Sequence, residues 1–191
     1  RFNLVFPEKR PFFLENAGLC SVGKSGDADL FYSRRIGIND DGSLVPIRGG
    51  ARLSGKTLGV NIGLLSMQTA QAGLAPSNNF TALRAKRDLA NRSNFGGIFV
   101  NRKAAGSSKK GRDDWNRTWG ADGKYGIGEA ITFTGFAGKT ETPGLTGRQY
   151  AFNGSGEYKD RKHRTSFEYG RVGEDFNPEV GFLRRTGGTR Y

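Results

Sequence analysis

The sequence has few apolar residues and no long hydrophobic run. Hydrophobic residues make up 35% of the 191 residues and charged residues 25%, whereas a typical soluble domain is ~45–50% apolar. No stretch approaches the ~18 consecutive apolar residues of a transmembrane helix, which excludes a helical membrane protein. The remaining classes are a disordered chain, a nucleic-acid binder and a sheet with one polar face. Aromatic residues, 12% of the chain, lie within patterned segments, which argues against disorder.

Cysteine and histidine are almost absent. Cys20 is the only cysteine and His163 the only histidine, so the chain cannot form an internal disulfide. The two residues are remote in sequence, which argues against a zinc site of the Cys/His type and against a Cys–His catalytic pair. We therefore expect no metal site, no cofactor and no catalytic residues. The chain starts at Arg1 without an apolar signal region, so we expect a mature product or a fragment.

One segment, Gly18–Ser25, matches the phosphate-binding loop pattern G-x-x-x-x-G-K-S. Such a loop binds phosphate only between a buried strand and the N-terminus of a helix. Here the next segment, Leu30–Ile36, has a strand-like pattern, and no alternation of helices and strands follows. We interpret Gly18–Ser25 as a glycine-rich turn.

The dominant signal is an alternation of side chains with a period of two, the period of a β-strand. In the segment 150–159, Tyr150, Phe152 and Tyr158 share one face, whereas Asn153 and Glu157 share the other. The following segment repeats this design: Thr165, Phe167 and Tyr169 alternate with Arg164, Ser166 and Glu168. The short stretch between them predicts a hairpin whose strands have one aromatic and one polar face.

The same unit recurs along the chain. The predicted hairpins pair residues 52–56 with 60–69, 80–88 with 95–103, 116–127 with 130–140, and 150–159 with the strand after 162. Longer polar links, rich in Gly, Ser, Pro and Lys, join the hairpins at 70–79, 104–115 and 141–148. Short turns that alternate with long loops, and strands of ~9–11 residues, are typical of an outer-membrane barrel. The segment 80–88 is irregular, because Phe80 has the parity of Arg84 and Lys86.

Residues 1–28 differ from the rest, since they hold prolines and show no clean alternation. We therefore predict an irregular lead-in over residues 1–28 and a β-barrel, or a fragment of a larger one, over 29–191. The predicted fold is all-β: an antiparallel up-and-down meander that forms a transmembrane β-barrel or partial barrel of about 9–10 strands.

The net charge of +12 and the pI of about 10.1 favour a polyanionic or phosphate-bearing partner. Basic residues interleave with aromatics, as in some nucleic-acid binders, but inward-facing positions of a barrel explain them equally, and no nucleic-acid partner is expected. The candidate ligand-binding residues of the lumen are Arg84, Lys86, Asn153, Glu157, Arg164 and Glu168. The alternative for each is a ladder of ion pairs between neighbouring strands.

Three segments resemble the DUF5916 family: Phe6–Glu15, Phe31–Gly37 and Glu174–Phe182. The stretches 63–69 and 101–102 between them also fit, so the resemblance spans nearly the whole chain. It implies the β-barrel region of a Gram-negative outer-membrane protein. In that family the barrel usually follows a periplasmic domain similar to family 9 carbohydrate-binding modules and is longer than this chain. The resemblance offers no catalytic residues.

The sequence thus predicts a non-catalytic protein of the cell outer membrane, in contact with lipid, that passes or binds a glycan or another anionic solute. Two alternatives stay open. One is a soluble basic β-sheet module that binds polyanions. The other is the barrel part of a carbohydrate-active hydrolase of the envelope, although the scattered acidic residues give no sign of paired carboxylates around a cleft.

Overall fold

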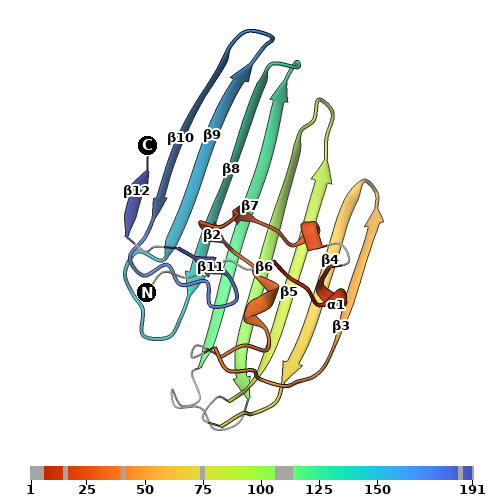
Figure 1. Ribbon diagram of the computed structural model, residues 1–191, viewed down its shortest axis with the longest axis vertical. Helices are drawn as coiled ribbons and strands as arrows, with labels where there is room; N and C mark the ends of the chain where they lie inside the picture. The colour runs from red at the N-terminus through yellow and green to blue at the C-terminus, as the bar shows by residue number, and fades with distance from the viewer. Residues whose placement is uncertain are drawn as a thin grey trace.

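Figure 1 shows the computed structural model, which describes residues 7–14, 17–39, 42–73, 76–105, 114–184 and 187–190. Eight long antiparallel strands form a meander in chain order, and a short ninth strand extends the sheet at one side. The strands are β3 (Ile47–Thr57), β4 (Val60–Thr69), β5 (Ser77–Asp88), β6 (Asn94–Ala105), β7 (Trp115–Ile127), β8 (Ile131–Glu141), β9 (Tyr150–Lys159), β10 (Arg164–Val172) and β12 (Gly188–Arg190). The all-β antiparallel meander is therefore confirmed.

Tight turns join the strands at one end of the sheet. Thr57 pairs with Val60, so the loop between β3 and β4 consists of Leu58 and Gly59, whose φ angles are 49° and 77°. Two successive residues with positive φ form the turn whose twist matches that of the flanking strands. Asn91 and Arg92, with φ of 55° and 59°, make a similar bend between β5 and β6.

The sheet does not close into a barrel. Its order runs from β12 through β10 to β3, and none of the described strands pairs with the outer side of β3. At the other side β12 pairs only with Gly170–Val172, so the rest of β10 is also a free edge among the described residues. The structure is an open, curved sheet with two long edges rather than a closed cylinder.

A second layer, which we call the cover, lies across one face of the sheet (Figure 1). It comprises the described parts of residues 7–39 and residues 173–184. Its elements are α1 (Pro11–Leu14), the 3₁₀ turns Ala17–Leu19 and Ser33–Arg35, and a small sheet of β1 (Gly23–Lys24), β2 (Ala28–Asp29) and β11 (Phe182–Leu183). Tyr32 N donates to Val180 O at 2.8 Å, which joins the N-terminal and C-terminal segments of the cover.

The hydrophobic core lies between the cover and the sheet. The cover contributes Val22, Leu30, Ile36, Phe176 and Val180, and the sheet contributes Leu65, Met67, Phe80, Ala82, Ile98, Val100, Phe136 and Ala151. Leu30 is fully buried because Gly120 and Gly138 lie beneath it: an added Cβ would be 2.2 Å from Leu30 Cδ1 at Gly120 and 2.9 Å from Cδ2 at Gly138. Side chains at these positions would push the cover away from the sheet.

One local prediction needs correction. The strand predicted over Leu30–Ile36 is wrong, because Ser33–Arg35 form a 3₁₀ turn, and Leu30 and Ile36 on its two sides are buried in the core between the cover and the sheet. Regular long strands begin at Ile47. The irregular parity of Phe80 is also explained: it lies on the covered face and is 7% exposed, packed in the core beside charged residues of the same strand.

Candidate functional site: the polar face of the sheet

All six predicted lumen residues lie on one face of the sheet, the face that the cover partly overlies. Cross-strand partners point to the same side, and Lys86 connects through Gly96, Asp122 and Phe136 to Asn153. Arg84, Glu157, Arg164 and Glu168 share this side. We call this surface the polar face. The alternation in the sequence therefore assigned these residues to a common face, and the structure shows what each of them contacts.

Arg84 links the sheet to the cover. Arg84 is 2% exposed, and its guanidinium forms a two-pronged pair with Asp122: Nη1 lies 2.6 Å from Oδ1, and Nη2 donates to Oδ2 at 2.9 Å. Nε donates to the carbonyl of Leu19 in the cover at 3.0 Å. The side chain passes over Gly96, where an added Cβ would be 2.6 Å from Nη1. Arg84 is thus committed to a buried structural pair.

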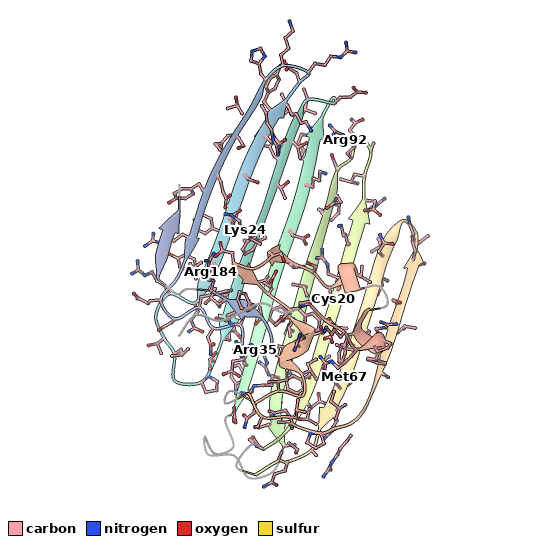
Figure 2. The ribbon with its side chains drawn as sticks, viewed as in Figure 1. Cys20, Lys24, Arg35, Met67, Arg92 and Arg184 are labelled. Carbon is pink, nitrogen blue, oxygen red and sulfur yellow. The ribbon has the colours of Figure 1, made fainter. Side chains whose placement is uncertain are left out.

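Glu168, together with Asn153, forms a second link between the sheet and the cover. Asn153 Nδ2 donates to Glu168 Oε1 at 2.7 Å, and Lys24 Nζ of the cover forms an ion pair with the same oxygen. Figure 2 places Lys24 on the cover in front of the sheet. This contact supports the interpretation of Gly18–Ser25 as a turn rather than a phosphate-binding loop, because Lys24 lies in strand β1 and its amine binds a carboxylate. In the described part of the chain no α-helix follows Lys24, as the interpretation as a turn requires.

Glu157 and Arg164 form the cross-strand pair that the ion-pair alternative predicts. Arg164 Nε lies 3.1 Å from Glu157 Oε1, and both side chains are partly open to solvent. Lys86 differs from the other five residues, since it has no hydrogen bond or ion pair to any described residue. Lys124, which the sequence analysis missed, lies on the same face two strands away and is likewise without such a partner in the described part of the chain.

A further polar cluster escaped the sequence analysis. Arg102 Nε donates to Glu179 Oε2 at 2.5 Å, Nη1 donates to Asn78 Oδ1 at 2.8 Å, and Nη2 pairs with buried Asp114. Asn116 Nδ2 donates to the carbonyl of Asn177 at 2.8 Å. These contacts join the cover to the long-loop end of the sheet. Parity alone places Arg102 and Asn116 on the polar face, but their partners lie far away in sequence.

The cover leaves part of the polar face open. It overlies the long-loop end and the middle of the sheet, whereas β7–β10 extend beyond it towards the short turns (Figure 1). The open part carries Thr134, Lys159, Arg164 and Ser166, all exposed. This region, with Lys86 and Lys124 near its border, is the surface where a polar ligand can reach the sheet.

The opposite surface, which we call the apolar face, carries large exposed hydrophobic side chains. Those on β3–β10 are Leu53, Ile62, Leu83, Phe95, Trp119, Tyr125, Ile127, Phe133, Tyr150, Tyr158, Phe167 and Tyr169. Phe167 is 64% exposed and Tyr158 43%. Phe99 and Trp119 pack at 4.2 Å between ring centroids. A patch this extensive on a water-facing surface marks a binding or membrane interface.

Glu8 connects two segments of the cover that are about 25 residues apart in sequence. Its Oε2 accepts hydrogen bonds from Arg10 Nη2 and Ser33 Oγ, both at 2.7 Å, and Arg10 Nη1 donates to the carbonyl of Ile36 at 2.7 Å. Burial raises the pKa of Glu8, but the hydrogen bonds from Arg10 and Ser33 outweigh burial and lower it from 4.5 to about 2. The charged form of Glu8 therefore holds the cover together.

A pH titration tests this role. The folded pKa of Glu8 lies below the unfolded value, so its contribution to stability is complete above pH 4.5 and is lost as the pH falls towards about 2. Replacing Glu8 by Gln should lower the free energy of unfolding at pH 7 and flatten its pH dependence between pH 4.5 and 2. The measurement is urea unfolding at a series of pH values. An equally steep pH dependence in Glu8→Gln would contradict the assignment.

No helix in the described part of the chain is long and apolar enough to cross a membrane. Among the described residues no three or more His, Cys, Asp or Glu side chains gather in a group that could hold a metal ion. Comparison of the chain with models of known protein families, with curated proteins and with solved structures finds no match.

Proposed function

We propose that this sheet is part of a transmembrane β-barrel of a Gram-negative outer membrane, with its apolar face against lipid and its polar face towards the lumen. One observation carries the proposal: every large hydrophobic side chain of β3–β10 that is exposed lies on the apolar face. A soluble protein would expose this surface to water at a high cost, whereas lipid tails would cover it.

The dimensions of the apolar face fit a bilayer. The outward residues of β7 from Trp119 to Ile127 carry no charge, and this stretch spans roughly 27 Å at the ~3.4 Å rise of an antiparallel strand. Once tilted, such a strand covers most of the ~25 Å apolar band of a barrel. Short turns and long links lie at opposite ends of the sheet, as in barrels whose short turns face the periplasm.

The free edges of β3 and β10 support closure by further strands. An exposed edge of this length would promote aggregation in a protein that ended there, and barrels remove edges by pairing them. We propose that additional strands pair with both edges. The resemblance to the DUF5916 family agrees with a larger barrel that follows a periplasmic carbohydrate-binding-like domain.

The proposed activity is non-catalytic passage or binding of a glycan or another anionic solute. Lys86 and Lys124 lie near the border of the open part of the polar face and have no counter-charge among the described residues. In a narrow lumen such charges raise the local concentration of anions. The cover fills the remaining part of the lumen as a plug.

Fractionation tests the location. The parent protein, by which we mean the full-length protein that contains this sheet, should be recovered in the outer membrane and be extracted only with detergent. It should also migrate differently on a gel before and after heating. The folded protein should bind vesicles without added detergent. Recovery of a soluble, monodisperse protein in detergent-free buffer would contradict the membrane proposal and favour a soluble basic module for polyanions.

Anion selectivity tests the lumen. In planar bilayers that contain the parent protein, the double substitution Lys86→Ala and Lys124→Ala should lower the permeability ratio of chloride to potassium by about threefold, because it removes two fixed positive charges. Lys162→Ala, in the exposed turn after β9, is the matched control and should leave the ratio unchanged. Equal ratios in all three proteins would exclude these lysines from the pathway.

A further inference from the structure

The described part of the chain has three charged residues among its buried polar groups, and one of them lacks an opposite charge. Arg84 pairs with Asp122, and Asp114 pairs with Arg102. Asp29 is 8% exposed, and its side chain has one hydrogen bond to a described residue, in which Gly26 N donates to Oδ2 at 3.2 Å. A buried carboxylate without a cation is costly. This exception to the pattern of paired buried charges needs an explanation.

A cavity opens beside Asp29. It lies between the cover and strands β3 and β4, has a volume of about 390 Å³, and includes Phe13, Leu19, Phe31 and Leu65 in its walls together with Asp29. Its size falls within the ~300–1,000 Å³ of small-molecule pockets. Its walls combine these apolar and aromatic side chains with polar residues, which besides Asp29 include Ser21, Ser25 and Ser54.

The other charged residues of the cavity wall have their own partners. Glu8 is bound by Arg10 and Ser33. Arg52 Nη1 donates to the carbonyl of Phe12 at 2.7 Å, and its guanidinium lies 5.4 Å from the centroid of the Phe12 ring. Asp29 is therefore the carboxylate in the cavity wall that is not already neutralised by a described residue.

We propose that this cavity binds a small organic ammonium ion, with the cationic nitrogen at the Asp29 carboxylate and the apolar part of the ligand between Phe13, Phe31 and Leu65. The ligand supplies the positive charge that the protein omits at this one buried acid. An aromatic wall also favours a cation over a neutral ligand, because ring faces attract positive charge. The inference does not depend on the membrane proposal, since the cover and β3–β4 form the cavity by themselves.

Direct titration tests the proposal. Isothermal titration calorimetry at pH 8 uses 2-phenylethylamine as the probe and 2-phenylethanol as its neutral counterpart. The amine should bind the full-length chain at least tenfold more tightly than the alcohol. Asp29→Asn should weaken amine binding at least tenfold and leave alcohol binding unchanged, because the amide oxygen keeps the hydrogen bond from Gly26 but removes the charge. Thermal unfolding verifies that the variant folds.

Asp27→Asn is the matched control. Asp27 lies two residues from Asp29, in the turn between β1 and β2, and is absent from the cavity wall. This variant should bind the amine as the unaltered chain does. Equal losses in both variants would show a general charge effect and overturn the proposal, as would amine binding that Asp29→Asn does not weaken.

Cys20 reports where the probe binds. It is the only cysteine of the chain and lines the cavity. Figure 2 shows it on the cover. Burial raises the pKa of its thiol, so alkylation is slow and depends on access to the cavity. The amine should slow maleimide labelling of Cys20 in the unaltered chain and in Asp27→Asn, but not in Asp29→Asn. Amine binding without protection of Cys20 would place the ligand elsewhere and refute the proposal.

Discussion

Replacing Arg84 by Leu is expected to lower the free energy of unfolding by about 3–5 kcal/mol, the usual cost of removing one partner of a buried ion pair. Asp122 would lose both contacts with the guanidinium, at 2.6 and 2.9 Å, and the carbonyl of Leu19 would lose its donor. Because Arg84 links the sheet to the cover, the variant should also release the cover. Urea unfolding measures the first effect, and the proteolysis rate at residues 17–39 measures the second.

The control for this experiment lies on the same strand and the same face. Lys86 is two residues from Arg84 and has no partner among the described residues, so Lys86→Ala should change stability by less than about 0.5 kcal/mol. Asp122→Leu combined with Arg84→Leu should recover much of the loss, because no unpaired charge stays buried. A small effect of Arg84→Leu, or additive losses in the double variant, would show that the pair does not hold the cover.

The hairpins were predictable because their signals are local. The predicted boundaries of β4 and β9, Val60–Thr69 and Tyr150–Lys159, are those of the structure. A strand with one aromatic and one polar face fixes its own period, and the short turn fixes the register of its partner. The same parity placed all six candidate residues on one face.

The cover was not predictable, because long-range contacts define it. Lys24 and Glu168 are 144 residues apart, and Arg102 and Glu179 are 77 apart. No local pattern predicts such pairs. The run Leu30–Ile36 resembles a strand because it is rich in apolar and aromatic residues, but Leu30 and Ile36 are buried on the two sides of a 3₁₀ turn. Sequence parity thus identified the face of Arg84 and Glu168 but not their structural role.

The described parts of the segments 6–15, 31–37 and 174–182 contact one another inside the cover. Arg10 donates to the carbonyls of Ser33 and Ile36, and Arg35 Nε donates to the carbonyl of Gly181 at 3.3 Å. Their polar residues therefore satisfy each other and position the core residues above the sheet. This arrangement gives a physical reason for the three segments to occur together in one chain.

Replacing Ala121 by Arg should reveal whether lipid or water contacts the apolar face. Ala121 lies on β7 in the middle of this face, in line with Gly97 and Ala137, and its side chain is exposed. An arginine at the midplane of a bilayer costs about 2–4 kcal/mol in a barrel, whereas an arginine on a water-exposed strand changes stability by less than about 0.5 kcal/mol. The two environments thus differ by a factor of ten or more in the folding equilibrium.

The measurement is urea unfolding of the protein in lipid vesicles, followed by its mobility on unheated gels. Ser166→Arg is the matched control: Ser166 is exposed on the polar face of β10, opposite Glu157, so an added positive charge there should be neutral or slightly favourable. Destabilisation by Ala121→Arg alone would assign lipid to the apolar face. If neither substitution changes stability, the apolar face contacts water or another protein, and the membrane proposal is wrong.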